Sequence, residues 1–172
     1  QSAGTRVSSS GAASGYHADN PAWLTEDCPL RGNEAFVYAH HKRLVEEMLA
    51  RWRIEHPQLQ QVIFRIGTIL GETVRNQITD LFEKPRPLAI RGSDSPFVFI
   101  WDQDVVGAIE HALRTDAAGI YNVAGDGALS IQEIVFLAVF FVPGGLASFR
   151  TRLAPLVRAI PRRAGAAPEP AE

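Results

Sequence analysis

The spacing of apolar and polar residues predicts one long helix and one well-buried strand near the middle of the chain. From about Glu34 to about Glu55, apolar residues recur every three or four positions with charged residues between them, as in an amphipathic helix. His56 and Pro57 end this helix, because the residue before a proline avoids the helical region. Residues 61–67 are largely apolar and rich in β-branched side chains, which is typical of a strand buried in a parallel sheet.

Shorter elements are predicted on both sides of this pair. The expected strands are 5–9, 88–90, 96–100 and 119–123, and the expected helices are 76–83 and 102–113. Ser130 and Glu133 have the spacing of a capping box and predict the start of a last helix. Asp102 can cap the helix that follows it, and Asn122 is most simply a hydrogen-bonding residue at a strand end.

Two stretches lack a regular pattern. Residues 11–32 form a long connection rich in Gly, Pro, Asn and Asp, and connections of this length often carry function. Residues 149–163 carry five arginines among apolar residues and two prolines. They are either a basic amphipathic helix on an anionic membrane or, as we prefer, a broken terminal helix without that role. Residues 164–172, rich in Pro, Ala and Glu, are expected to be disordered.

Composition narrows the classes of function. With 46% hydrophobic residues and a net charge of -2, the chain has the composition of a soluble globular protein and no basic aromatic motif for nucleic acid. A single cysteine, Cys28, excludes an internal disulfide and a cysteine-based zinc site, and the scattered histidines indicate no metal site. No apolar run reaches the ~20 residues of a membrane helix. No secretory signal opens the sequence, so the expected location is the cytoplasm.

The most informative residues are Tyr38 and Lys42, which lie four apart on one face of the predicted long helix. A phenol is a poor base at neutral pH, and a nearby ammonium favours its ionised form. Such a pair can exchange protons with a substrate hydroxyl or carbonyl. The alternative is an ordinary helix with a half-buried tyrosine and a solvated lysine, and the spacing alone leaves both interpretations open.

The residues upstream and downstream favour the first interpretation. Ser8–Ser9–Ser10 ends a predicted strand and runs into a glycine turn, Asp19–Asn20–Pro21 follows, and Tyr-x-x-x-Lys comes next. A Gly-x-Tyr-Asn-Val strand with a glycine turn lies at 119–127. In this order the chain resembles the extended short-chain dehydrogenase/reductases, the nicotinamide-dependent epimerases, dehydratases and related dehydrogenases. The resemblance runs from about Thr5 to about Ile134.

The resemblance implies an α/β fold, specifically the C-terminal part of a Rossmann-type parallel sheet with a small substrate-binding subdomain. Residues 1–149 would form a partial epimerase/dehydratase domain, and residues 150–172 a basic, then Pro/Ala-rich tail. No G-x-G-x-x-G or G-x-x-G-x-x-G motif is present. We therefore expect the chain to be the C-terminal portion of a longer protein, without the glycine-rich half that binds the cofactor pyrophosphate. A homodimer is also possible.

The resemblance also implies a Ser–Tyr–Lys catalytic set. Ser10 is the best match for the serine and Ser9 the second. Ser10 would hydrogen-bond the reacting oxygen, Tyr38 would take or give its proton, and Lys42 would hold the phenolate and the nicotinamide ribose. The implied cofactor is NAD or NADP, and the implied substrate is a small molecule with a hydroxyl or carbonyl group, such as a sugar nucleotide.

Besides Tyr38 and Lys42, the resemblance assigns Arg65 and Ile66 to cofactor binding, because the family usually has an Arg-Pro pair beside the nicotinamide at this place. The alternative for Arg65 is an ion pair at the strand end. Ile66 replaces the usual proline, Trp101 a usual histidine, and Ser14 a usual tyrosine, with Tyr16 nearby. Because of these departures, the resemblance does not specify which class of substrate the protein binds.

The implied function is an NAD(P)-dependent epimerase, dehydratase or oxidoreductase. The alternative, from another class, is a catalytically inactive remnant that acts at most as a binding or interaction module.

Overall fold

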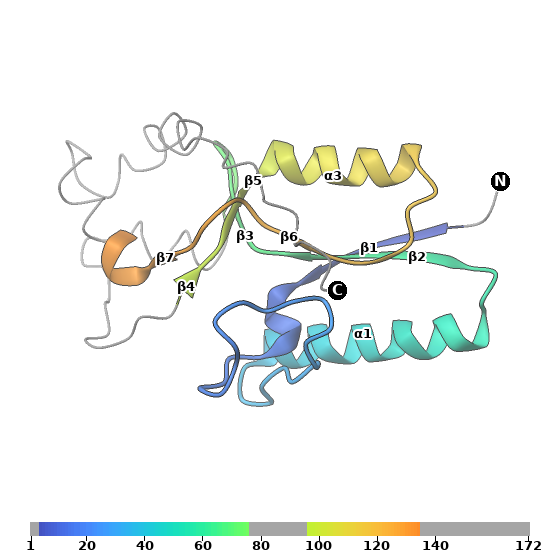
Figure 1. Ribbon diagram of the computed structural model, residues 1–172, viewed down its shortest axis with the longest axis horizontal. Helices are drawn as coiled ribbons and strands as arrows, with labels where there is room; N and C mark the ends of the chain where they lie inside the picture. The colour runs from blue at the N-terminus through green and yellow to red at the C-terminus, as the bar shows by residue number, and fades with distance from the viewer. Residues whose placement is uncertain (1–3, 76–95, 135–172) are drawn as a thin grey trace, which may run out of the picture. The chain divides into compact units, whose positions relative to one another are not determined.

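The computed structural model describes residues 4–75 and 96–134 (Figure 1). The chain divides into two compact units, residues 1–70 with 97–125, and residues 71–96 with 126–172. The predicted helix 76–83, the predicted strand 88–90 and the whole segment 150–172 lie outside the described residues. The predicted division at residue 149 therefore stays a prediction.

The first unit is built on a three-stranded parallel sheet. Its strands are β1 (Gly4–Ser10), β2 (Gln60–Ile66) and β6 (Gly119–Val123), in the order β1–β2–β6. Ser9 pairs with Arg65 and Arg65 with Asn122, so the carboxyl ends of the three strands meet at one edge of the sheet. This parallel arrangement confirms the predicted α/β fold.

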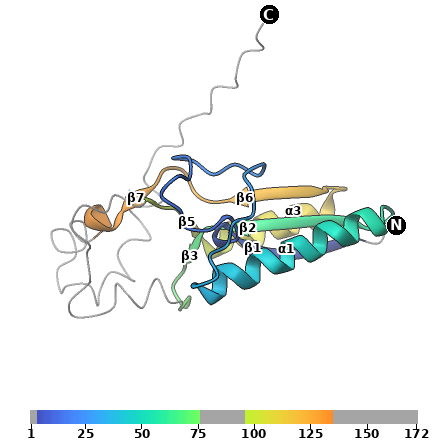
Figure 2. The same cartoon turned by 90° about the horizontal axis from the view of Figure 1, so that it is seen from below.

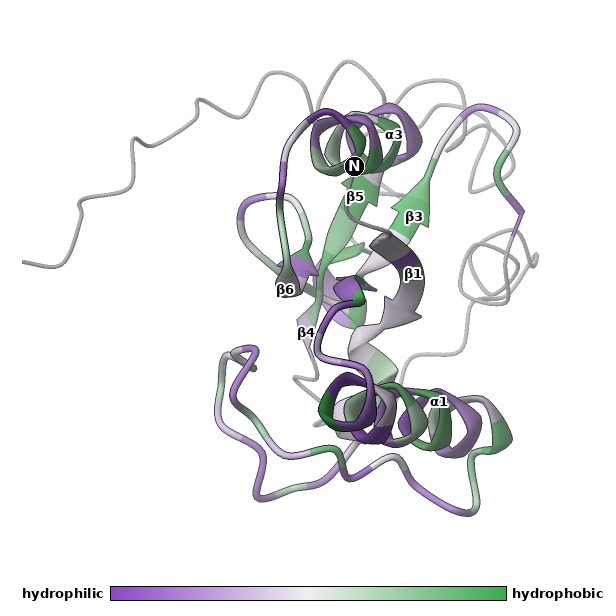
Figure 3. Ribbon diagram, turned by 90° about the vertical axis from the view of Figure 1, so that its right-hand side faces the viewer, coloured by the Kyte–Doolittle hydropathy of each residue, from purple (hydrophilic) through white to green (hydrophobic). Residues whose placement is uncertain are grey.

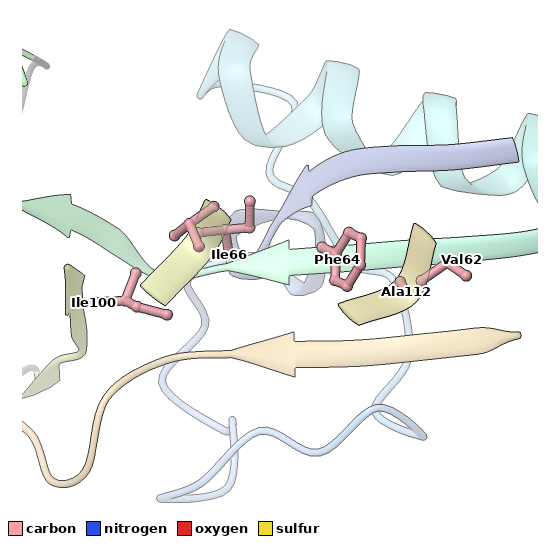
Figure 4. Close-up of a cluster of buried hydrophobic side chains, with 6 residues drawn as sticks. Val62, Phe64, Ile66, Ile100 and Ala112 are labelled. Carbon is pink, nitrogen blue, oxygen red and sulfur yellow. The ribbon is translucent and has the colours of Figure 1, made fainter. Parts of the chain in front are cut away.

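Two helices cover opposite faces of this sheet (Figures 1 and 2). They are α1 (Val37–Glu55) and α3 (Asp102–Arg114). Alternate residues of β2, namely Val62, Phe64 and Ile66, face α3 and form the core with Ile100, Val105 and Ala112 (Figure 4). The side chain of Arg65 points to the other face, toward α1.

Helix α1 exists as predicted, but most of the large apolar residues that define its period do not face the sheet. Its buried residues are Ala39, Glu46 and Leu49. Leu44, Met48 and Trp52 are 44%, 46% and 50% exposed, and apolar and polar colours alternate around this helix in Figure 3. The helical period of the sequence was therefore right, while the face that it implied was mostly wrong.

The helix also begins three residues later than predicted, at Val37 rather than Glu34. The Asn33 carbonyl accepts the N–H of Phe36 in a turn (3.1 Å), and the Asn33 side chain is bonded to the backbone of Tyr16. The local turn and the tertiary bonds of Asn33 to Tyr16 together hold residues 33–36 in a non-helical conformation.

The predicted strand 96–100 is divided into β4 (Pro96–Phe97) and β5 (Phe99–Trp101). Val98 lies between them, and its carbonyl accepts the N–H of Thr68 (3.0 Å). Thr68 opens a strand that we did not predict, β3 (Thr68–Leu70), which pairs in parallel with β5. The remaining elements are the 3₁₀ turn η1 (Gly11–Ser14), the strand β7 (Leu129–Ser130) and the helical residues 131–134.

Two local predictions can be checked directly. The capping box is confirmed, because the Ser130 hydroxyl accepts the N–H of Glu133 (3.2 Å) and the Glu133 carboxylate accepts the N–H of Ser130 (2.7 Å). The bond from the Ser130 N–H, followed by one from the Ser130 hydroxyl (2.9 Å), lowers the pKa of the Glu133 carboxyl. The cap of α3 is Trp101, which makes no side-chain capping bond, so the prediction for Asp102 was one position off. The Asp102 carboxylate instead accepts the N–H of Gln103 (2.8 Å).

Candidate active site

Tyr38 and Lys42 lie together at the carboxyl end of β1. The Lys42 ammonium donates a hydrogen bond to the carbonyl oxygen of Ser8 (3.2 Å) and lies 5.6 Å from the centroid of the Tyr38 ring. Tyr38 is 48% exposed. The first turns of α1 thus bring a phenol and an ammonium side by side, with the phenol accessible to a ligand.

The two serines that were considered for catalysis differ in their surroundings. Ser9 is buried, and its hydroxyl donates to the carboxylate of Glu46. Ser10 is half-buried at the end of β1, and its hydroxyl accepts the N–H of Ala12 (3.3 Å), which caps η1. The hydroxyl of Ser10 retains capacity to donate to a ligand. The catalytic role of Ser10 stays a prediction.

Three aromatic side chains form a row that ends at Tyr38. The rings of Tyr16 and Phe36 have centroids 5.7 Å apart, and those of Phe36 and Tyr38 6.1 Å apart. The side chain of Asn33 fixes Tyr16, because it accepts the N–H of Tyr16 (2.7 Å) and donates to its carbonyl (3.2 Å). We gave Tyr16 no role from the sequence. The one feature that pointed to it was that Ser14 stands where the family usually has a tyrosine, two residues before Tyr16.

The pKa of Tyr16 is raised, first by desolvation and then by its proximity to Tyr38, since two phenolates repel each other. We expect Tyr38→Phe to lower the pKa of Tyr16, but not to the ordinary value, because desolvation is the larger cause. The chain has three tyrosines, so ¹³C-labelled tyrosine and an NMR titration resolve each ring. Tyr121→Phe is the matched control. An unchanged Tyr16 titration in Tyr38→Phe would contradict this contact.

The structure places Arg65 and Ile66 away from the surface. Arg65 forms an ion pair with Glu46 (2.8 Å), in which the two side chains are 3% and 1% exposed. This is the strand-end ion pair that we considered as the alternative. Ile66 is buried in the core on the other face of β2. The assignment of both residues to cofactor binding stays a prediction, and neither side chain is presented at the surface.

The loop before α1 is tied to the same ends of the strands. Asn122 on β6 donates its backbone N–H to the Glu26 carboxylate (2.7 Å) and its side-chain amide to the Leu24 carbonyl (2.9 Å). Arg65 donates to the carbonyl of Glu26 (2.9 Å). These bonds confirm Asn122 as a hydrogen-bonding residue at a strand end, and they hold the loop over the sheet edge.

Two further kinds of feature are absent from the described part of the chain. Residues 4–75 and 96–134 contain no cluster of His, Cys, Asp or Glu that could hold a metal ion. In the same ranges, no helix combines the length and apolar character required to cross a membrane.

The fold and these motifs agree with the comparisons with known proteins. A sequence model of the NAD dependent epimerase/dehydratase family matches residues 2–124. The chain therefore belongs to this family.

Solved structures with a similar fold include a UDP-glucose 4-epimerase and an NADPH-bound protein. The UDP-glucose 4-epimerase of Thermus thermophilus, solved with NAD, has a TM-score of 0.65 and 22% sequence identity over 83% of this chain and 49% of its own. RMD from Pseudomonas aeruginosa, solved with NADPH, has a TM-score of 0.62 and 22% identity over 80% of this chain and 50% of its own.

The chain matches only part of its relatives. An uncharacterized protein of Mycobacterium tuberculosis is 22% identical over 121 residues, which are 70% of this chain and 32% of that protein. The chain thus spans about a third of this curated relative and about half of the two similar structures.

Proposed function

We propose that this chain supplies the proton-transferring half of an NAD(P)-dependent epimerase, dehydratase or oxidoreductase acting on a hydroxyl or carbonyl group, for example of a sugar nucleotide. In the complete enzyme, a glycine-rich half would bind the cofactor pyrophosphate. The observation that carries the proposal is that the Lys42 ammonium is bonded to the Ser8 carbonyl (3.2 Å) and lies 5.6 Å from the ring centroid of an exposed Tyr38.

Each residue of the proposed set has a role that its surroundings support. Tyr38 is exposed, so its phenol can reach a substrate oxygen and give or take a proton. Ser10 would donate its hydroxyl hydrogen to the same oxygen and hold it in place. Lys42 would stabilise negative charge on the phenol oxygen, because its ammonium is already anchored beside that ring.

The residues of the site fit a nicotinamide cofactor in part. The half-buried Lys42 amine has three donors and uses one on Ser8, so it suits the hydroxyls of a ribose. Arg65 fits less well, because its guanidinium is buried against Glu46. A bound nicotinamide would supply the hydride chemistry. We therefore assign Lys42 and Tyr38, rather than Arg65, to direct cofactor contact.

The proposal predicts that Lys42→Met weakens cofactor binding and lowers turnover in the natural protein that carries both halves. The expected loss of cofactor affinity is about 10- to 100-fold, since a hydrogen bond to a charged group contributes about 1.5–3 kcal/mol. The measurements are a fluorescence titration with NADH and NADPH and the initial rate with a panel of nucleotide sugars.

The matched control is Lys84→Met, the same change at the only other lysine of the chain. Cofactor affinity and turnover of Lys42→Met that equal those of wild type would mean that Lys42 is an ordinary surface residue. No turnover by the wild-type natural protein with any nucleotide sugar or simple alcohol would favour the inactive remnant.

A further inference from the structure

The most deeply buried charges of the described residues lie directly behind the proposed site. Arg65 on β2 donates from Nη2 to Glu46 Oε2 (2.8 Å) and from Nε to both carboxylate oxygens (3.0 and 3.2 Å). The hydroxyl of Ser9 on β1 donates to Glu46 Oε1 (2.5 Å). The single carboxylate of Glu46 therefore joins α1 to two neighbouring strands.

Glu46 lies on the same face of α1 as the proposed catalytic residues. It follows Lys42 by four residues and Tyr38 by eight, so the three side chains lie one above another along the helix. Lys42 is bonded to Ser8 and Glu46 to Ser9, which are adjacent residues of β1. A shift of α1 by one turn, about 5.4 Å, would break both contacts.

A gain in folding stability does not by itself explain why this ion pair is buried. Removing two charges from water is costly, and replacing a buried ion pair with apolar side chains is often neutral or stabilising. A charged pair has a stricter geometry than an apolar contact, because the planar guanidinium must meet the carboxylate along fixed directions. Ion pairs of this kind can specify one register of packing where apolar side chains allow several.

We propose that Glu46 is a positioning residue of the active site. Held by Arg65 and Ser9, its carboxylate fixes the register of α1 on the sheet, and so the place of Lys42 and Tyr38 at the carboxyl end of β1. Arg65 and Ser9 act through Glu46 and do not touch substrate. This inference rests on the proposed function, and it gives Arg65 a role other than cofactor binding.

The test is the double variant Glu46→Leu/Arg65→Leu, which leaves neither charge buried alone. We expect it to unfold cooperatively on heating but to have a kcat about 10²-fold lower, since a misplacement of about 1 Å can have that effect. A second readout is competitive acetylation of Lys42 relative to Lys84, measured by peptide mass spectrometry in the natural protein. Labelling of Lys42 should rise as its bond to Ser8 is lost.

Ser9→Ala is the milder variant and decides the question if the double variant does not fold. It removes only the link from Glu46 to β1 and keeps the ion pair. We therefore expect a smaller fall in kcat and a smaller rise in Lys42 labelling than in the double variant. The control is Glu110→Gln/Arg114→Gln, which removes an exposed ion pair of α3 (3.1 Å) and should change neither readout.

The outcomes separate this inference from the proposed function. Wild-type kcat and Lys42 labelling in the folded double variant and in Ser9→Ala would overturn the positioning role, as would a loss of kcat without a change in labelling. Tyr38→Phe is measured beside them. If Tyr38→Phe retains wild-type turnover, the proposed function fails, while Lys42 labelling still reports whether Glu46 holds the helix.

Discussion

Tyr38→Phe is expected to lower turnover of the natural protein by about 10²–10⁴-fold, the range typical of a general acid–base group. The change removes the hydroxyl that would carry the proton and keeps the ring that contacts Phe36. Cofactor affinity should change little, because the variant keeps the aromatic ring that would contact the cofactor, and the bond of the Lys42 ammonium to Ser8 remains. The measurements are the steady-state rate and a cofactor titration on the same preparation.

The control for this prediction is Tyr121→Phe. Tyr121 lies on β6, is 41% exposed and donates its hydroxyl to the Ala118 carbonyl (2.9 Å), so the variant removes a phenol of similar exposure at another place. We expect it to keep wild-type turnover. Near-normal turnover in Tyr38→Phe would remove Tyr38 from the mechanism and would leave the resemblance as one of fold only.

Residues 1–172 alone are expected to bind NADH and NADPH negligibly and to self-associate. The sequence contains no glycine-rich phosphate-binding turn, which supplies much of the affinity for a dinucleotide. Within the described residues β1 pairs with β2 only, and an unpaired strand edge can pair with another chain. Leu44, Met48 and Trp52 on α1 add exposed apolar surface.

A fluorescence titration with both cofactors and light scattering over a range of protein concentrations test this expectation. The comparison is the proposed longer protein with a glycine-rich half, which should bind one of the cofactors. A monodisperse monomer of residues 1–172 with micromolar affinity for NADH or NADPH would contradict the expectation. It would mean that the pyrophosphate is bound by residues other than a glycine-rich turn.

The helices and strands of the described residues were largely predictable from the sequence. The periods of 3.6 and 2 depend on neighbours along the chain, so α1, β2 and β6 were predicted within a few residues. The same holds for the capping box, whose two residues are three apart. The division of the strand at Val98 was missed, because β5 pairs with a strand that begins at Thr68, about thirty residues away in sequence, and local periodicity carries no information about that partner.

For the candidate site, the sequence determined that Tyr38 and Lys42 share a helix face, since a spacing of four residues fixes that relation locally. Only the tertiary structure decided where this face points. It places Glu46 inside and Met48 outside, against the order that hydrophobicity alone suggests. The physical reason is that the environment of Glu46 is made by Arg65 and Ser9. These partners come from the strands β2 and β1, and the spacing of residues within one helix carries no information about them.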